Sequence, residues 1–358
     1  MRQAGPDAVA PTASRPRNQH LLLRFLAKKL LITVGLLLGV TIVTFGLVQV
    51  VPGDPVTANL SDQALNDPAA VAAFREKWGL DQPVYQQYLH YLGNLLHGDL
   101  GTSQQTGRAV MADLGHYVPA TMELAIPTMV LALLLGTGIG MLAAVRNGRI
   151  TDQLVRIGAL LGLSAPPFWL SLVVLYVFFY KLGIAPSGGR LSTDFSPPPT
   201  TTGMYTVDAA LAGQWDVAWD AAQHLLLPVL VLTCLTVAML VRFVRSSMLE
   251  VLQQDYIRAA YAKGLPGRTV LRRHLLRAGL VPVITVSGLA FASLLSGTVL
   301  VENIFGWPGL GQYAFRSATA LDLPAILGVS LFVALVYTMV NLTVDLLYGL
   351  IDPRIRLS

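Results

Sequence analysis

Long runs of apolar residues, separated by polar segments, dominate the chain. Six of them are about 20 residues long, the length that an α-helix needs to cross the hydrocarbon core of a bilayer. The pattern therefore predicts an all-α, polytopic membrane protein with six transmembrane helices. The runs are Leu30–Val51, Leu124–Val145, about Val155–Leu182, Leu225–Val241, Leu280–Val301 and about Ile326–Leu350.

The third run contains two adjacent prolines, Pro166 and Pro167. Proline lacks the backbone N–H that a helix needs and clashes with the preceding turn. We therefore expect this span to be kinked there or broken into two pieces.

The composition agrees with a membrane protein. Hydrophobic residues make up 54% of the chain and charged residues 13%, against roughly 25% charged in soluble domains. The single cysteine, Cys234, excludes an intramolecular disulfide.

The basic residues show the expected orientation. Nineteen of the 25 Lys and Arg residues fall before the first run, in or beside the second and fourth loops, or at the C-terminus. Positive charge collects on the cytosolic side of inner membranes. We therefore predict cytosolic termini, and we attribute the net charge of +5 to topology and not to nucleic-acid binding.

The runs and loops predict three regions. Residues 1–22 form a disordered cytosolic tail, and residues 23–123 form the first transmembrane helix and a large extracytoplasmic loop with short helices. Residues 124–358 form a five-helix core that includes a cytosolic loop at 242–279. Trp215 and Trp219, in the third loop, are expected on a short helix that either anchors at the membrane interface or packs on the loop.

The fourth loop, residues 242–279, carries eight basic residues. A short helix from Asp255 should stop at Gly264, and a second helix should begin near Thr269 after the turn at Pro266 and Gly267. Such a hairpin can serve as a rigid knob for another protein. The alternative is a loop whose arginines only enforce topology and contact anionic lipid.

One string in this loop, from Arg258 to Gly264 (Arg-Ala-Ala-Tyr-Ala-Lys-Gly), resembles the "EAA" motif of permeases in binding-protein-dependent ABC importers. Other strings are similar to the dipeptide and oligopeptide branch of that family, and they occur in the same order over nearly the whole chain. They are Pro52–Pro55, Gly79–Pro83, Gly98–Ser103, Arg245–Leu249, Glu302–Phe305, Pro308–Gly311, Asp345–Tyr348 and Asp352–Arg354. Arg258 departs from the motif, which has Glu there, so a salt bridge of that Glu does not carry over.

The resemblance implies a type I importer fold and a role in importing di- or oligopeptides, or a related solute such as nickel or glutathione. It also implies a homologous second permease, two cytosolic P-loop ATPases that bind ATP and Mg, and an extracytoplasmic binding protein. The first helix of the fourth loop would be the helix that couples to an ATPase. Its residues are Asp255, Tyr256, Arg258, Ala259, Ala260, Tyr261, Lys263 and Gly264, of which the small ones would allow close approach of a partner.

The sequence lacks the motifs of an enzyme. It contains no G-x-x-x-x-G-K-[ST] phosphate loop, and its six histidines are not spaced as metal ligands. We therefore expect no catalytic residue, cofactor site or metal site in this chain. An ion-gradient-driven secondary transporter is the alternative function, and it would need paired ionisable residues and repeated broken helices.

The solute path is expected along the fifth run, which carries several hydroxyl groups. Asp345 is the acid that lies deep in a span, where an ionisable residue is a functional candidate by default. The preferred interpretation is a structural hydrogen bond to a neighbouring helix, with support from Asn341. The path candidates are Ser287, Ser293, Ser296, Thr298 and Asn341.

Overall fold

The computed structural model describes residues 17–351, except 51–53, 55, 58–59 and 61. In these residues the regular structure is helical, and one isolated bridge joins Thr102 to Ala109. Most of the predicted tail lies outside the described residues. Residues 17–22, which we expected to be disordered, are instead the first turns of α1 (Arg17–Val50).

Four long helices follow predicted apolar runs, and each begins before its run does. The helix α6 (Val110–Val145) begins 14 residues before the predicted start at Leu124, so the boundary predicted at 123/124 falls inside a continuous helix. The others are α10 (Trp215–Leu252), α13 (Leu276–Gly297) and α16 (Leu323–Ile351). A hydrophobic run marks only the part of a helix in an apolar environment, and the hydrogen-bonded backbone continues past it.

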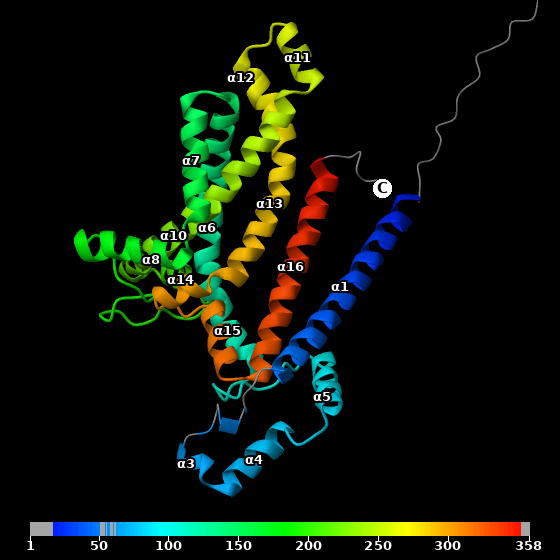
Figure 1. Ribbon diagram of the computed structural model, residues 1–358, viewed down its shortest axis with the longest axis vertical. Helices are drawn as coiled ribbons and strands as arrows, with labels where there is room; N and C mark the ends of the chain where they lie inside the picture. The colour runs from blue at the N-terminus through cyan, green and yellow to red at the C-terminus, as the bar shows by residue number, and fades with distance from the viewer. Residues whose placement is uncertain (1–16, 51–53, 55, 58–59, 61, 352–358) are drawn as a thin grey trace, which may run out of the picture.

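The pair of α6 and α10 forms the centre of the molecule (Figure 1). Glycines on α6 permit the close approach: a Cβ on Gly136 would lie 2.8 Å from Cβ of Leu240, and one on Gly140 would lie 2.7 Å from Cβ of Val244. Small residues commonly bring membrane helices together in this way.

The third run is broken, as predicted from its prolines. The helix α7 (Ile150–Ser164) ends at Ala165, which is extended, and α8 (Pro167–Val174) continues into η1 (Leu175–Lys181). The two halves meet at an angle of 102°. As a result α8 projects sideways from the bundle in Figure 1.

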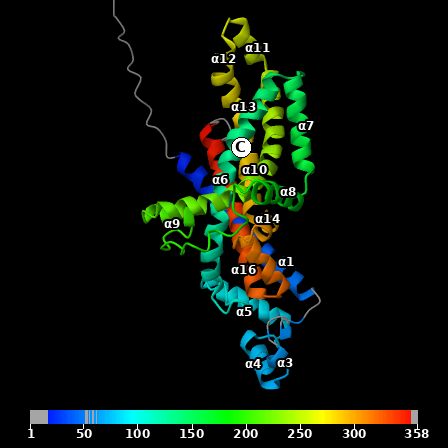
Figure 2. The same ribbon diagram turned by 90° about the vertical axis from the view of Figure 1, so that its left-hand side faces the viewer.

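The first and last long helices, α1 and α16, pack against each other and run in opposite directions. The described chain therefore begins and ends on the same side of the molecule (Figures 1 and 2). In Figure 1 both ends of the described chain lie nearer to the fourth loop than to the short helices of the first loop.

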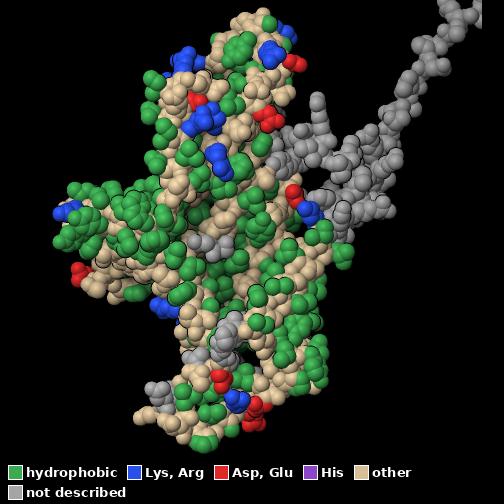
Figure 3. Space-filling view, viewed as in Figure 1, with side chains coloured by type: hydrophobic (Ala, Val, Ile, Leu, Met, Phe, Trp, Pro, Cys, Tyr) green, Lys and Arg blue, Asp and Glu red, His purple; other side chains and the backbone are tan. Residues whose placement is uncertain are grey.

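The fourth loop holds α11 (Asp255–Ala262), α12 (Gly267–Thr269) and η2 (Val270–Leu275), and η2 leads directly into α13. The predicted helix, turn and second helix are thus present. In Figure 3, Lys and Arg side chains gather at this end, while hydrophobic side chains cover the middle of the molecule.

The opposite end is built from short helices. The first loop contributes α3 (Asp62–Leu65), α4 (Pro68–Trp78) and α5 (Val84–Leu96), which we expected. After α13 the chain turns at Thr298 into α14 (Val299–Ile304), α15 (Leu310–Thr319) and then α16, so the fifth run does not reach Val301 as one helix. Figure 2 shows α9 (Tyr205–Leu211), from the third loop, extending from the bundle.

The two tryptophans of the third loop do not lie on a separate helix. Trp215 and Trp219 form the first turns of α10 and are exposed. Four described helices are long and apolar enough to cross a membrane, and the bent pair α7 and α8–η1 makes a fifth candidate. The apolar part of α1, Leu31–Leu47, is shorter.

Candidate functional site

The helix α11 stops where the sequence predicted. Gly264 has φ +77°, a left-handed conformation that glycine adopts without steric cost. Its N–H bonds to the carbonyl of Tyr261 at 2.9 Å, and the N–H of Leu265 bonds to the carbonyl of Ala260 at 3.3 Å. These two bonds satisfy carbonyls that the end of the helix leaves free.

One face of α11 is buried against its own loop. Ile257 and Ala260 are 1% and 6% exposed, and they pack with Val270 of η2 and with Val251 and Leu252 at the end of α10. The prediction that Ala260 lies on a surface open to a partner is therefore wrong. A helix this short is held in place by such packing, and Ala260 is one of the residues that provide it.

The other face of α11 is exposed and charged. Arg258 lies 3.7 Å from Asp255 across one turn, and both side chains are largely exposed, at 74% and 98%. An ion pair in water contributes little to stability, so these groups are available to another surface. The exposed members of the predicted set are Asp255, Tyr256, Arg258, Ala259, Tyr261, Lys263 and Gly264.

The C-terminal part of α10, just before α11 and here called the base of α10, is hydrogen-bonded to the turn between α6 and α7. Arg245 Nε donates to Asp152 Oδ1 at 2.5 Å, and its Nη2 donates to Asp152 Oδ2 at 2.9 Å. A third bond joins Arg245 Nη2 to Asn147 Oδ1 at 3.1 Å. In the sequence Arg245 was noted only as the start of a string similar to the family, and Asp152 was missed.

The predicted path residues do not form one lining. Ser287 Oγ donates to the carbonyl of Val283 within α13, Ser293 is exposed, and Asn341 is half-buried on α16. The side chain of Ser296 lies outside the described residues. Thr298 is 0% exposed and cannot line a path. The role of Ser287, Ser293 and Asn341 stays a prediction.

Asp345 on α16 forms an ion pair with Lys29 on α1, with 2.5 Å between Oδ2 and Nζ. Both side chains are little more than one third exposed. The structure thus provides a bond to a neighbouring helix, with Lys29 as the donor, while the support from Asn341 stays a prediction. In the sequence Lys29 was one of the basic residues before the first run that indicated the orientation, and it was not assigned a partner.

Thr298 belongs to a buried cluster around Glu302 at the opposite end of the molecule. Glu302 Oε1 accepts bonds from Thr298 Oγ1 at 2.7 Å and Thr121 Oγ1 at 2.8 Å, and Oε2 accepts from the N–H of Gln312 at 2.8 Å. Burial raises the pKa of this carboxyl, and the hydrogen bonds oppose the rise. The cluster joins α6, α14 and α15.

A second buried carboxylate, Glu123 of α6, holds the third loop. Arg190 donates to Glu123 Oε2 from Nη2 at 2.6 Å and from Nε at 3.2 Å. The guanidinium carbon also lies 3.6 Å from the ring centre of Tyr205, and the N–H of Thr206 donates to Glu123 Oε1 at 2.7 Å. These contacts fix the loop and the start of α9 on α6.

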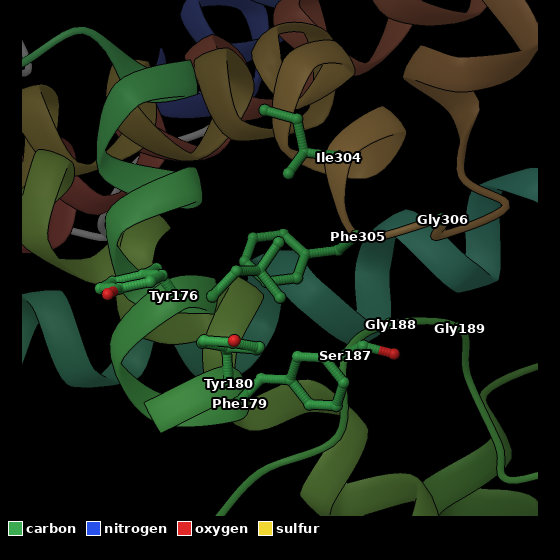
Figure 4. A pocket seen from close by; sticks show the side chains of 10 residues that line it. Tyr176, Phe179, Tyr180, Ser187, Gly188, Gly189, Ile304, Phe305 and Gly306 are labelled. Carbon is green, nitrogen blue, oxygen red and sulfur yellow. The ribbon is translucent and has the colours of Figure 1, made fainter. Parts of the chain in front are cut away.

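An apolar groove of about 500 Å³ lies between η1 and the junction of two loops (Figure 4). The ring of Phe179 and the phenol rings of Tyr176 and Tyr180 come from η1. Across the groove the N–H of Gly189 donates to the carbonyl of Phe305 at 2.8 Å. The remaining lining residues are Leu175, Ser187, Gly188, Ile304 and Gly306.

Two family models cover nearly the whole chain. The "binding-protein-dependent transport system inner membrane component" model matches residues 136–357, and the model for its N-terminal part matches residues 22–125. The chain belongs to this family of permeases. It is therefore an inner-membrane permease subunit of an ABC importer, which confirms the resemblance seen in the motifs.

Curated relatives align with this chain over most of their lengths. The probable D,D-dipeptide transport permease DdpB of Escherichia coli K12 is 47% identical, over 88% of this chain and 93% of that protein. The dipeptide permease DppB of Alkalihalophilus pseudofirmus is 41% identical, over 94% and 100%. DppB of E. coli K12 is 40% identical, over 94% and 99%.

Among solved structures, the inward-facing MetNI methionine ABC transporter matches this permease with a TM-score of 0.48 and 16% identity. The match covers 68% of this chain and 97% of that chain.

Proposed function

We propose that this permease imports dipeptides or short oligopeptides. The observation that carries the proposal is the identity of 40–47% to DdpB and DppB, over 88–94% of the chain, because these proteins are named for dipeptide transport. Solute selection by a separate binding protein would leave this chain to provide the path and its coupling to ATP hydrolysis.

The proposed assembly contains this chain, a homologous second permease, two P-loop ATPases and an extracytoplasmic binding protein. The chain would have six spans with both termini in the cytosol. Two observations support this topology: α1 begins and α16 ends on one side of the molecule, and basic side chains gather at the end that holds α11. The ATPases, not this chain, would bind ATP and Mg.

The exposed face of α11 would be the surface that an ATPase contacts. This face protrudes from the molecule and carries charged and aromatic side chains on a helix fixed by its buried face. A partner that binds α11 would move it together with the end of α10, since Ile257 packs on Val251 and Leu252.

The test is reconstitution of the complete transporter in proteoliposomes with its binding protein. We expect ATP-dependent uptake of labelled dipeptides and stimulation of ATP hydrolysis by the loaded binding protein. Comparison of L,L- and D,D-dipeptides would separate the DppB-like from the DdpB-like substrate. Uptake driven by an ion gradient without nucleotide would contradict the proposal.

The docking surface has its own test and a matched control. Tyr261→Asp places a charge on the exposed face of α11, and we expect it to lower ATPase co-purification at least tenfold, since a desolvated unpaired charge is costly. Tyr85→Asp makes the same change on α5, at the opposite end of the molecule, where the side chain is 64% exposed. Equal co-purification of both variants would refute the docking assignment.

A further inference from the structure

The ion pair of Asp152 and Arg245 is bidentate, a geometry that membrane topology alone does not require. The guanidinium meets the carboxylate edge to edge, with two bonds of 2.5 and 2.9 Å. Such bidentate pairs fix direction as well as distance. The Asp152 side chain is 2% exposed and that of Arg245 is 20% exposed, so water screens the pair only partly.

The pair connects three segments of the chain. Asp152 lies in the first turn of α7, and its Oδ2 also accepts the N–H of Gly148 in the turn after α6, at 3.0 Å. Arg245 lies ten residues before α11 and also binds Asn147 in the same turn. The end of α6, the start of α7 and the base of α10 are therefore held together by side-chain bonds.

The segments joined by this pair also contact α11 at one end and lead to the aromatic groove at the other. On one side, α11 packs on the end of α10 through Ile257. On the other side, α7 leads to the break at Ala165 and Pro166, then to α8, and from α8 to η1, which lines the aromatic groove. A movement of α11 would thus reach α7 through the base of α10 and the bidentate pair.

We propose that Asp152 and Arg245 are positioning residues that transmit movement of α11 to the broken third segment, so that the pair sets how much solute moves for each ATP hydrolysed. The inference rests on the proposed function, in which an ATPase drives α11. It does not require either residue to touch solute or nucleotide. Its central requirement is that the pair holds while α11 moves.

The experiment uses the complete transporter with its ATPases and binding protein, reconstituted in proteoliposomes. The variants are Asp152→Asn, Arg245→Gln and Arg245→Lys. Arg242→Gln is the matched control, since Arg242 lies one turn earlier on α10, is exposed and forms no ion pair that we find within the described part of the chain. ATP hydrolysed per dipeptide taken up is measured along with ATPase co-purification.

For Asp152→Asn and Arg245→Gln we expect co-purification and basal hydrolysis within twofold of the unaltered transporter, while the ATP spent per dipeptide rises at least tenfold. Arg245→Lys keeps the charge but not the second bond. Its ratio of ATP hydrolysed per dipeptide should therefore fall between that of the unaltered transporter and that of the two charge-removing variants. Arg242→Gln should leave the ratio unchanged.

Two results would overturn the inference. One is an unchanged ratio in both charge-removing variants. The other is a parallel loss of hydrolysis and co-purification in every pair variant, including Arg245→Lys, which would make the pair a fold-stabilising contact only. Failure of the proposed function is distinct, because then the unaltered transporter itself would show no nucleotide-dependent uptake.

Discussion

Replacing Arg190 with methionine should release the third loop from the helix bundle. In the structure its guanidinium binds Glu123 through two nitrogens, donates to the carbonyl of Gly203 at 2.7 Å and stacks on Tyr205. The side chains of Arg190 and Glu123 are only 4% and 2% exposed. Methionine fills much of the same volume and leaves the Glu123 carboxylate buried without its cation.

The expected size of the effect follows from this burial. Removing one partner of a buried ion pair costs about 3–5 kcal/mol, because the remaining charge keeps its desolvation penalty. Glu123 keeps two bonds from Thr206, at 2.7 and 2.8 Å, which favours the lower end of that range. About 3 kcal/mol corresponds to a change of roughly 150-fold in the opening equilibrium of the loop.

The assay is native-state proteolysis of the third loop in lipid nanodiscs, with a protease that does not cleave at basic residues. When opening and closing are fast, the cleavage rate follows the population of the open form. We expect Arg190→Met to raise the rate about 100-fold. Removing the charge in Glu123→Gln/Arg190→Met should restore most of the protection, because no buried ion is then left unpaired.

A matched control is Lys181→Met, which removes an exposed cation just before the same loop. It should leave the cleavage rate within about threefold. The reasoning would be refuted if Arg190→Met were cleaved no faster than this control, or if the double variant were cleaved as fast as the single one. The second outcome would mean that lost packing on Tyr205, and not the stranded charge, opens the loop.

Three further predictions concern other contacts. Gly136→Leu should destabilise the contact of α6 with Leu240 by about 1–3 kcal/mol through overpacking, seen as a lower midpoint of thermal inactivation, whereas Gly138→Leu, with no atom within 4 Å of its Cβ, should not. Asp208 accepts four hydrogen bonds from residues 201–203. Burial alone would raise the pKa of its carboxyl, but these bonds lower it by more, so the pKa lies below the usual 3.8. Its contribution to stability is therefore present above about pH 4 and lost as the pH falls through the lowered value, so acid-induced cleavage of the loop should become pH-independent in this range in Asp208→Asn. Asp345→Asn should leave ATP-driven uptake within threefold, since we interpret the ion pair with Lys29 as a structural contact between α16 and α1; a loss above tenfold would point to a proton-relay role instead.

Local signals in the sequence predicted the helices and their breaks well. The break between α7 and α8 follows from Pro166 and Pro167, because a missing N–H acts on its own turn whatever the rest of the chain does. Gly264 likewise stops α11 by its own backbone freedom. The ends of α10 could not be predicted from hydropathy, because its first and last turns lie beyond the apolar run.

The orientation of a residue on a short helix was harder to predict. Ala260 was expected on the docking face, but it lies against Val270 and Leu265. Composition cannot choose between the two faces of α11, since small residues suit either a partner or the loop itself. The choice depends on where η2 returns along the helix, which is a tertiary contact.

The polar clusters escaped sequence reasoning because their members are far apart in the chain. Thr121 and Glu302 are separated by 181 residues, and Asp152 and Arg245 by 93. A usable signal was nevertheless present. Glu123 and Glu302 each adjoin an apolar run, and a carboxylate there is costly unless hydrogen-bonded, so each could have been assigned an unknown partner in advance.

The broken third segment connects the pair of Asp152 and Arg245 to the aromatic groove. It begins at the pair of Asp152 and Arg245, and its other half, η1, faces Phe305, three residues after the buried Glu302. Asp152 binds Arg245 through two bonds at the first attachment, and Glu302, near the second, accepts bonds from Thr121, Thr298 and Gln312. Because Pro166 and Pro167 interrupt the backbone bonds between the two halves, a tilt of α7 under the proposed coupling would bend the chain at this joint and shift η1 beside Phe305. If an ATPase drives α11 as proposed, this joint would serve as a hinge between α7 and the aromatic groove.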